Sequence, residues 1–199
     1  DVERSRGLGD VYKRQIWHDA GRAVTPDGKT ALMIGTGDIG SHFARLCKAV
    51  GMETIGVRRN PSIEAEGIDH VVGFESLDNV LQYADVIAMS VPSTPATYHL
   101  LNAERIASLK PDSIIINAGR GNAIESRALA DALAEGRIRG AALDVTEPEP
   151  LPANSPLWCE PKCLITPHVA GGNHLEITER SIILSLIHIS GPTRPLYIS

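Results

Sequence analysis

The most constraining feature of the sequence is a short apolar run that ends in closely spaced glycines. Residues 30–35 read TALMIG, and Gly35 opens a Gly-x-Gly-x-x-Gly spacing that closes at Gly40. The run has the length and composition of a buried strand, and the residues after it have the periodicity of a helix. Glycines between a strand and a helix let backbone N–H groups and the helix N-terminus approach a pyrophosphate, although a glycine-rich turn can also occur without a ligand. We therefore expect a nucleotide-binding turn formed by Gly35, Gly37, Asp38, Ile39 and Gly40.

Short apolar runs and helix-like stretches alternate through the rest of the chain. Further strands are expected at residues 54–58, 70–74, 85–92, 112–117, 140–145 and 162–167. Helices are expected at residues 39–51, 76–84, 102–110 and 125–136. Asn102 and Glu125 with Ser126 provide start signals for the last two helices, and Gly136 provides a stop signal. Strands that alternate with helices predict an α/β fold with a doubly wound parallel sheet, which is the Rossmann-type NAD(P)-binding architecture.

The helix expected at residues 39–51 has a clear pattern of large apolar residues. Phe43, Leu46, Cys47 and Val50 recur at helical spacing. A helix in a doubly wound fold covers one face of the sheet, so we expect these residues to form its packed face.

The composition limits the classes of protein to which the chain can belong. With 43% hydrophobic and 22% charged residues over 199 positions, the sequence is typical of a globular domain. A formal net charge of −5 argues against a nucleic-acid partner. The sequence has no apolar run long enough to span a membrane and no N-terminal secretion signal, so we expect a cytoplasmic protein without a membrane partner. Cys47, Cys159 and Cys163 lack the spacing of a disulfide framework or a zinc site, and we expect reduced thiols and no bound metal.

The two ends of the chain have a feature that belongs to nucleic acid rather than to protein. DVYKRQ at residues 10–15 can be encoded by DNA whose reverse complement encodes LSLIHI, which stands at residues 184–189. An inverted repeat of this kind resembles translated transposase-adapter sequence from a sequencing library. We therefore expect residues 16–183 to form the dinucleotide-binding domain, and residues 1–15 and 184–199 to be adapter-derived, non-native ends. The alternative is a real C-terminal strand or helix, and a genomic read across both junctions distinguishes the two.

Two arginines follow the second expected strand. Arg58 and Arg59 stand where NAD-binding proteins usually carry an acidic residue for the ribose hydroxyls, about 20 residues after the glycines. The sequence has no acidic residue at positions 54–61. A guanidinium group binds phosphate oxygens well and can accommodate the 2′-phosphate of NADP. We therefore expect NADP(H) rather than NAD(H) as the cofactor, the alternative being arginines that only solvate a loop.

Charged side chains also follow the later strands. Arg120 lies just past the end of one expected strand, and His168 lies just past the end of another. Asp144 and Glu149 stand between them in the sequence. The carboxyl ends of the strands are where an open parallel sheet binds its ligands. A histidine with a carboxylate partner can act as a general acid, and an arginine can hold a substrate carboxylate. Because these residues all follow strands of one sheet, we favour a catalytic site over separate surface ions or loop caps.

Four longer motifs resemble a known family. They are VPSTPATYHLLN (residues 91–102), LKPDSIIINAGRG (109–121), GAALDVTEPEPLP (140–152), and SPLW followed by ITPHVAGG (155–172). They resemble, in the same order, the signatures of the D-isomer-specific 2-hydroxyacid dehydrogenases, which include phosphoglycerate dehydrogenases and glyoxylate/hydroxypyruvate reductases. The resemblance extends over residues 17–179 and covers the nucleotide-binding domain of that family. It implies an oxidoreductase that transfers a hydride between NAD(P)H and the C2 carbonyl of a small 2-oxo acid.

The resemblance also implies roles for individual residues. Arg120 is implied as the catalytic arginine, Glu149 as the acid paired with His168, and His168 as the proton donor. Arg120 and His168 are also implied to contact the cofactor, and Asp144 to bind its nicotinamide carboxamide. The implied lining of the cofactor cleft consists of Val91, Pro92, Thr97, Ala118, Gly119 and Gly171.

The chain departs from the family pattern in one large respect. Only a short stretch precedes the first strand, and the expected last helix stops near Ile183, so we expect this chain to lack the substrate domain. We therefore expect a cofactor-binding portion with little activity of its own, from a homodimeric parent that acts on a small 2-oxo or 2-hydroxy acid. One alternative is a non-catalytic NAD(H)-sensing scaffold, which the presence of Arg120, Glu149 and His168 disfavours. The other is a methyltransferase, which leaves those residues unexplained.

Overall fold

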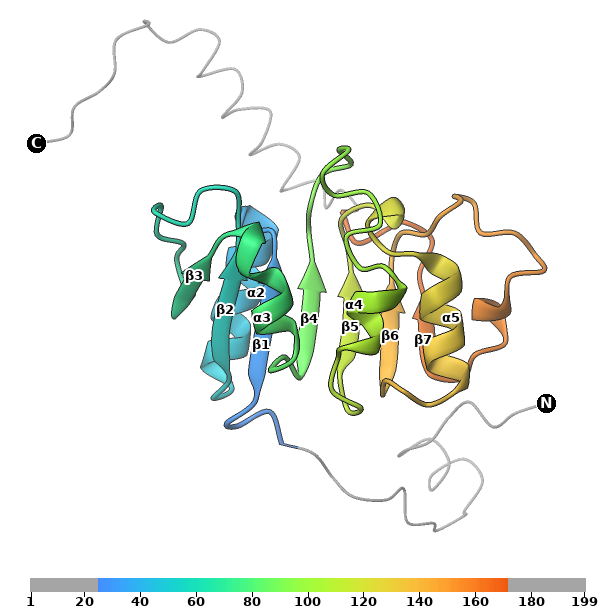
Figure 1. Ribbon diagram of the computed structural model, residues 1–199, viewed down its shortest axis with the longest axis horizontal. Helices are drawn as coiled ribbons and strands as arrows, with labels where there is room; N and C mark the ends of the chain where they lie inside the picture. Colours follow the sequence, from blue (N-terminus) through green and yellow to red (C-terminus); the bar gives the residue numbers. More distant parts are fainter. Residues whose placement is uncertain (1–24, 172–199) are drawn as a thin grey trace, which may run out of the picture. The chain divides into compact units, whose positions relative to one another are not determined.

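Seven parallel strands form one sheet in a computed structural model that describes residues 25–171 (Figure 1). They are β1 (Thr30–Ile34), β2 (Glu53–Val57), β3 (His70–Val72), β4 (Val86–Met89), β5 (Ile114–Asn117), β6 (Gly140–Leu143) and β7 (Cys163–Ile165). Each lies within or next to a predicted strand. The sheet order is β3-β2-β1-β4-β5-β6-β7, so the chain first moves outward from β1 to β3 and then crosses to β4. This reversal creates a switch point between β1 and β4, where open α/β sheets bind ligands.

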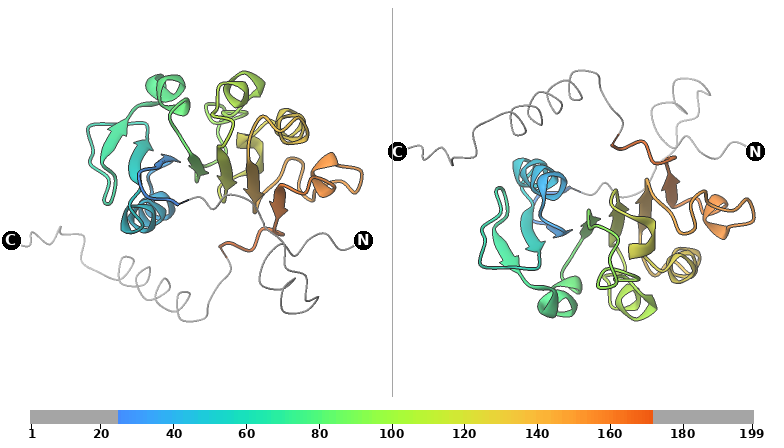
Figure 2. Two further views of the ribbon diagram at one scale, coloured as in Figure 1. Left: turned by 90° about the horizontal axis from the view of Figure 1, so that it is seen from below. Right: turned by 90° about the horizontal axis from the view of Figure 1, so that it is seen from above.

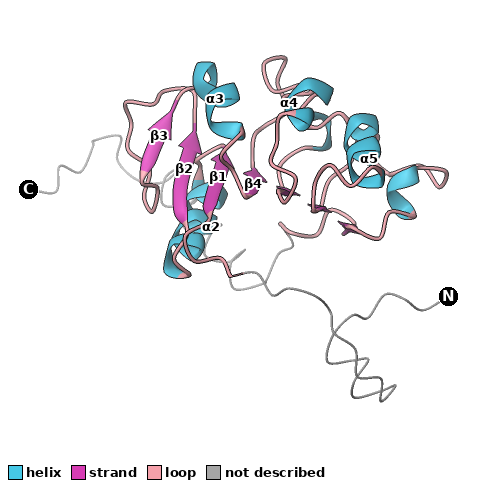
Figure 3. Cartoon of the chain, turned by 60° about the horizontal axis from the view of Figure 1, so that its bottom comes forward, coloured by secondary structure: helices cyan, strands magenta, loops and turns pink. Residues whose placement is uncertain are grey.

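Helices cover both faces of the sheet, as predicted for a doubly wound fold. α2 (Asp38–Ala49) lies on one face beside β1 and β2, whereas α3 (Leu77–Leu81), α4 (Ala103–Ala107) and α5 (Ser126–Ala134) lie on the other (Figure 2, Figure 3). Short 3₁₀ helices η1 (Phe74–Ser76), η2 (Gly121–Ala123) and η3 (Pro156–Trp158) lie in the connections. Right-handed crossovers that leave β1 in opposite directions place their helices on opposite faces. Within residues 25–171, no helix is long and apolar enough to cross a membrane.

The chain divides into two compact units, Asp1–Pro167 and His168–Ser199. The whole sheet belongs to the first unit, and the second is described only at residues 168–171. The ends predicted to be adapter-derived, residues 1–15 and 184–199, lie outside the described residues. The same is true of residues 16–24 and 172–183, the outer parts of the predicted domain.

The core has one apolar layer on each face of the sheet. The larger layer joins the sheet to α3, α4 and α5 and includes the fully buried Leu32, Ile87 and Ile115. The smaller layer lies beneath α2 and contains Ala31, Met33, Ala44, Cys47 and Met52. Alternate residues of β1 enter alternate layers, so this strand is buried on both faces, as its continuous apolar run predicts.

The packed face of α2 differs from the sequence prediction. The buried residues of this helix are Gly40, Ala44 and Cys47. Leu46 and Val50 are 58% and 52% exposed, so the prediction is wrong for these two residues. It is confirmed for Cys47, which is buried, and for Phe43, which is half-buried against the layer beneath α2. Small residues face the sheet because the helix begins in the glycine turn and approaches the strand closely. A Cβ atom added to Gly40 would lie 2.0 Å from the carbonyl oxygen of Gly35.

Some predicted helix signals are confirmed, whereas the helices themselves are shorter than predicted. Asn102 caps α4, because its Oδ1 accepts a hydrogen bond from the backbone N–H of Arg105 at 3.0 Å. Gly136 follows α5 with a φ of 69°, the left-handed conformation that ends many helices. Glu125 stands at the N-cap of α5, but its side chain accepts a hydrogen bond from the Ala103 N–H instead. α3 and α4 each span five residues, and each begins one residue into the predicted stretch and ends three residues before it does.

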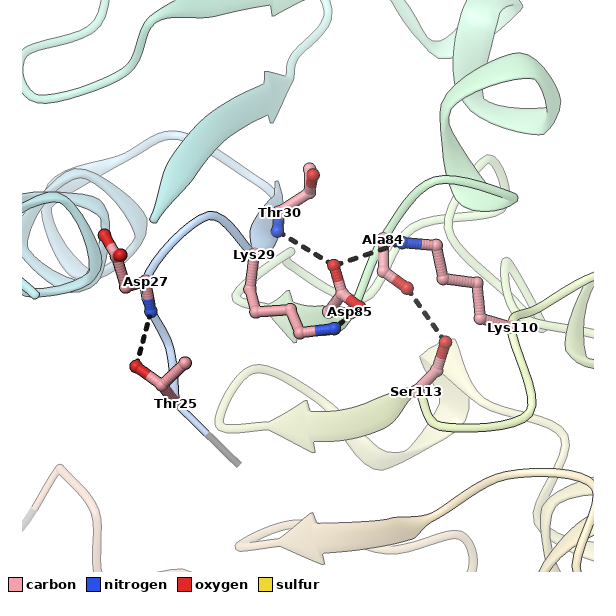
Figure 4. Close-up of polar contacts among 8 residues, drawn as sticks. All are labelled: Thr25, Asp27, Lys29, Thr30, Ala84, Asp85, Lys110 and Ser113. Atoms are coloured by element: carbon pink, nitrogen blue, oxygen red, sulfur yellow. Dashed lines mark hydrogen bonds and ion pairs between the residues drawn. The ribbon is translucent and has the colours of Figure 1, made fainter. Parts of the chain in front are cut away.

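The amino ends of the strands are held together by the carboxylate of Asp85 (Figure 4). Asp85 precedes β4 and accepts hydrogen bonds from the Thr30 N–H at 2.9 Å and from Lys29 and Lys110 Nζ at 3.2 and 3.1 Å. Burial raises the pKa of Asp85, but the bonds from Thr30 and the two lysines outweigh burial and lower it overall. The cluster therefore connects β1, β4 and the loop before β5 at the sheet edge opposite the predicted site.

Candidate functional site

Most of the residues predicted for a site follow the carboxyl ends of strands. The glycine turn follows β1, the two arginines follow β2, and residues 91–97 follow β4. Residues 118–120 follow β5, and residues 144–149 follow β6. Because the strands are parallel, these segments lie at one edge of the sheet, on either side of the switch point (Figure 1).

The glycine turn is tightly packed on the inside and open on the outside. Gly35 has a φ of 96°, and a Cβ atom there would lie 2.8 Å from the carbonyl oxygen of Ser90. Among the described residues, no heavy atom lies within 4 Å of a Cβ atom built on Gly37. Gly37, Asp38 and Ile39 are exposed. The first turn of α2, whose backbone N–H groups have no intrahelical partner, is therefore accessible from outside.

The two arginines after β2 have different surroundings. The guanidinium Nη1 of Arg58 donates to the carbonyl oxygens of Ile63 and Glu64 at 3.1 and 3.3 Å. Its backbone N–H donates to the Val72 carbonyl at 3.0 Å, which continues the pairing of β2 with β3. Arg59 is exposed, and within residues 25–171 its side chain makes no hydrogen bond or ion pair. Arg58 therefore holds the loop in shape, and Arg59 presents its guanidinium group to solvent.

A buried threonine fixes the loop after β4. Thr97 is 7% exposed, and its hydroxyl donates to the Pro92 carbonyl at 2.6 Å and accepts from the Thr94 N–H at 2.9 Å. Val91 is buried at the start of the loop, whereas Pro92 is exposed. The Thr97 hydroxyl thus sets the shape of the segment that carries both residues.

Asn117, the last residue of β5, organises the loop that carries Arg120. Asn117 is 1% exposed, its Oδ1 accepts from the Gly119 N–H at 3.0 Å, and its Nδ2 donates to the Arg120 carbonyl at 3.0 Å. A Cβ atom on Gly119 would lie 2.9 Å from backbone atoms of Val91, so the loops after β4 and β5 are in close contact. Ala118 is half-buried, and the exposed Arg120 donates to the Gly119 carbonyl at 2.7 Å. The sequence prediction omits Asn117, although a polar residue at a strand end beside a glycine is a turn signal.

Asp144 is buried after β6 and is joined to the strand beside it. Asp144 is 9% exposed, accepts a hydrogen bond from the Thr166 hydroxyl at 2.6 Å, and donates its N–H to the Asn117 carbonyl at 3.0 Å. Thr166 is another residue that the sequence prediction omits, and its signal is its place in the same motif as the predicted His168. Glu149 lies farther along the same loop and is exposed.

His168 and Gly171 belong to the second unit. His168 directly follows the last residue of the first unit, is exposed, and has a φ of 54°. A positive φ is uncommon in residues other than glycine and concentrates at functional sites. Gly171 is exposed and, within the part of the chain that the structure describes, a Cβ atom there would meet no heavy atom within 4 Å. The pairing of His168 with Glu149 remains a prediction.

The described residues offer no metal site, and two of their three thiols are unreactive. Among residues 25–171, no group of three His, Cys, Asp or Glu side chains could hold a metal ion. Burial, with a smaller contribution from Glu160, raises the pKa of Cys163 to about 11. Burial also raises the pKa of Cys47. Both thiols therefore stay protonated near neutral pH, and neither has the thiolate character of a nucleophile.

The open side of the glycine turn fits a dinucleotide pyrophosphate. A phosphate that approaches Gly37 meets no side chain there and can reach the N-terminal N–H groups of α2. The helix is 12 residues long, and its dipole places positive partial charge at this end. The arrangement can thus bind an anion on one side of the switch point, while Arg120 supplies a cation on the other.

Comparison with known proteins agrees with this geometry. The sequence profile described as D-isomer specific 2-hydroxyacid dehydrogenase, NAD binding domain, matches residues 4–170. A glyoxylate reductase from Korarchaeum cryptofilum is 35% identical over 179 residues, which cover 87% of this chain and 52% of that protein. The solved structure of a D-isomer specific 2-hydroxyacid dehydrogenase family protein from Aeromonas salmonicida superposes with a TM-score of 0.82 at 39% identity, covering 94% of this chain and 60% of the other. An NADPH-dependent glyoxylate/hydroxypyruvate reductase from Sinorhizobium meliloti, solved with NADP and sulfate, gives 0.78 at 29% identity, covering 90% and 57%.

The chain spans about half the length of the curated relatives it matches. The match to the family profile covers most of the chain, and the sheet, the glycine turn and the loops after β5 and β6 form the nucleotide-binding architecture that the profile describes. The chain therefore belongs to the D-isomer-specific 2-hydroxyacid dehydrogenase family and contains its Rossmann-type NAD(P)-binding domain.

Proposed function

We propose that the parent of this chain reduces small 2-oxo acids to 2-hydroxy acids, and that the chain is its cofactor-binding portion. The observation that carries the proposal is a glycine turn open at Gly37 at the same switch point as a loop that presents Arg120. A pyrophosphate site near an exposed guanidinium group suits a dinucleotide and a carboxylate substrate. Relatives named glyoxylate reductase and hydroxypyruvate reductase support this substrate class.

The proposed reaction assigns one role to each of the predicted catalytic residues. The bound cofactor supplies or accepts the hydride at C4 of its nicotinamide ring. Arg120, on the loop organised by Asn117, binds the substrate carboxylate and polarises the C2 carbonyl. His168 donates a proton to the carbonyl oxygen in the reductive direction and removes it in the oxidative direction, and Glu149 orients the imidazole. Asp144 binds the nicotinamide carboxamide.

We propose NADP(H) as the preferred cofactor. Arg59 is exposed just past β2, where the adenosine ribose lies in such folds, and Arg58 holds the loop beside it. The Sinorhizobium meliloti relative is described as NADPH-dependent, which supports the choice. Fluorescence titration of the chain with NADPH and NADH tests it. Arg59→Asp should weaken NADPH binding by about tenfold or more, because a guanidinium–phosphate pair is lost, and leave NADH binding within about twofold. Equal affinity for both cofactors before and after the substitution would mean that Arg59 only solvates a loop.

The proposal also concerns the chain by itself. We propose that it binds dinucleotide with negligible turnover, because exclusion of water and positioning of the substrate need a second domain. Reduction of glyoxylate by the isolated chain would contradict this. We further propose a cytoplasmic, homodimeric parent, which cell fractionation and sedimentation of the full-length protein test.

Kinetics of the full-length parent test the proposed reaction. Oxidation of NADPH is followed with glyoxylate or hydroxypyruvate as substrate. His168→Gln and Arg120→Ala should each lower kcat/KM by about a hundredfold or more, the usual effect of losing a general acid or a substrate-binding charge. His70→Gln and Arg127→Ala serve as matched controls, since both residues are exposed and lie outside the carboxyl-edge loops. Near-wild-type turnover of either catalytic variant would refute the assignment.

A further inference from the structure

The structure pairs a histidine with a carboxylate that the proposed reaction does not use. His99 lies between β4 and α4, and Glu147 lies in the loop after β6. The His99 Nε2 and Glu147 Oε2 atoms are 2.6 Å apart, and each side chain is 29% exposed. The Tyr98 ring stacks on the His99 ring with centroids 4.0 Å apart. The contact therefore joins two segments that are distant in the sequence and partly shielded from solvent.

His99 also has an unusual backbone conformation. Its φ is 45°, in the left-handed region, which is strained for a residue other than glycine. Histidine and asparagine enter this region more readily than most residues. The His99 backbone N–H donates to the Asn122 carbonyl at 2.8 Å. Both the backbone and the ring of His99 are thus engaged by other loops, which is the condition under which such a conformation persists.

The contacts of His99 lead to the two loops that carry the proposed catalytic groups. Asn122 stands two residues after Arg120, and Glu147 stands two residues before Glu149. We propose that His99 is a positioning residue that connects the loop after β5 to the loop after β6 and so sets the relative position of Arg120 and Glu149. The catalytic meaning of this placement rests on the proposed function, whereas the mechanical connection does not.

Other contacts between the same two loops explain why one side chain can have this effect. A Cβ atom on Gly121 would lie 1.9 Å from the Thr146 carbonyl oxygen, so the two loop backbones are in direct contact. The Ser126 hydroxyl donates to the Glu147 carbonyl at 2.9 Å. These contacts fix the backbone at residue 147, and His99 fixes its side chain. The loop therefore leaves this point in a defined direction toward Glu149.

Amide hydrogen exchange of the 199-residue chain tests the connection without any assumption about activity. His99→Asn is the informative variant, because asparagine tolerates the positive φ but removes the imidazole that reaches Glu147. Exchange at the hydrogen-bonded amides of residues 99, 123 and 124 should accelerate about tenfold or more, with β1 unchanged. Glu147→Ala should give the same pattern, and the double variant should exchange no faster than the single ones. Glu147→Gln keeps an acceptor for the ring N–H and should restore most of the protection.

His70→Asn, at an exposed position at the start of β3, controls for the substitution itself. Uniform acceleration through the sheet would show that His99 serves stability alone and would overturn the proposal. Unchanged exchange at residues 123 and 124, or additive effects of the two single variants, would overturn it as well.

Kinetics of the full-length parent then separate positioning from binding. His99→Asn should lower kcat for 2-oxo acid reduction about tenfold and leave the Kd for NADPH within about twofold, while Glu147→Gln stays near wild type. A change in the Kd alone would contradict a role in placing Arg120 and Glu149. If the parent reduces no 2-oxo acid at all, the proposed function fails, and the exchange experiment still decides whether His99 connects the two loops.

Discussion

The glycines of the turn after β1 differ in what a side chain would meet. A Cβ atom on Gly40 would lie 2.0 Å from the carbonyl oxygen of Gly35, a backbone atom that cannot move aside cheaply. A Cβ atom on Gly37 would point into open space, and the φ of Gly37 is −76°, which any residue can adopt. Gly40 is therefore required by the packing of α2, whereas Gly37 is required only if a ligand approaches it.

This difference predicts that one glycine-to-alanine substitution lowers stability and that the other weakens cofactor binding. Gly40→Ala should lower the free energy of unfolding by about 3 kcal/mol, the upper range for an overpacked site. Gly37→Ala should change it by less than about 0.5 kcal/mol and yet weaken NADPH binding about tenfold, since its methyl group occupies the approach to the helix N-terminus. Urea unfolding and fluorescence titration of the two variants measure these quantities. Unimpaired binding by Gly37→Ala would mean that the pyrophosphate does not lie at this turn.

The carboxylate of Asp69, just before β3, ties that strand to β2 and α2. Its Oδ2 accepts hydrogen bonds from the backbone N–H and the hydroxyl of Thr54 at 3.1 and 2.8 Å, and Lys48 of α2 contacts its Oδ1. The hydrogen bonds from Lys48 and Thr54 lower the pKa of Asp69 to about 2. A carboxyl group whose pKa is lower in the folded chain than in the unfolded chain adds stability above the unfolded pKa, and this contribution is lost as pH falls through the folded pKa.

The attachment of β3 should therefore weaken in acid. As pH falls from about 4 toward about 2, the Asp69 contribution, on the order of 1 kcal/mol after allowance for partial exposure, should disappear. Asp69→Asn should be less stable than the unmodified chain at pH 6 and lose less stability between pH 6 and pH 3, as followed by urea unfolding at each pH. Glu53→Gln, an exposed substitution on β2, is the control. An Asp69→Asn variant with the same pH dependence as the unmodified chain would contradict this.

The elements themselves were largely predictable from the sequence, because most strands are short, largely apolar runs in a sheet with helices on both faces. The error in the packed face of α2 arose because this helix lies close to the sheet. Leu46 in α2 and Val50 just after it are large and apolar but exposed, whereas the helix meets the sheet chiefly through Ala44 and Cys47. Small side chains at these positions let the helix lie close to the glycine turn. A search for amphipathic patterns detects large apolar residues. It misses small residues that let a helix lie close to the sheet.

The candidate site was predictable only where motifs carry it. Arg120 stands in a motif at a strand end, so its position could be inferred from the sequence. Asn117 and Thr166 support the motif residues through hydrogen bonds, and His99 does so from 48 residues away from Glu147. These three residues also stand within the quoted motifs, but only the folded arrangement of the loops shows which residue each of them contacts.

The two edges of the sheet have different physical characters. At the carboxyl edge, glycines make close backbone contacts, His99 has a positive φ, and Arg59 and Arg120 are exposed. These features suit ligand binding and add little to the stability of the fold. The amino edge holds the compact cluster around Asp85, whose side chain is 14% exposed (Figure 4). Stability and ligand binding should therefore respond to substitutions at opposite edges of the same sheet.

Asp85→Ala tests this separation. The substitution removes a hydrogen bond to the Thr30 N–H and two partly exposed ion pairs, with Lys29 and Lys110. We expect the free energy of unfolding to fall by about 2 kcal/mol, because the backbone donor loses a charged acceptor while both ammonium groups can return to water. The Kd for NADPH, measured well below the unfolding transition, should stay within about twofold, because the described contacts of the Asp85 side chain are with Lys29, Thr30 and Lys110 at the amino edge. Asp112→Ala, at an exposed residue just before β5, should change neither quantity. A loss of NADPH affinity in Asp85→Ala as large as that in Gly37→Ala would show instead that the two edges are coupled through the strands.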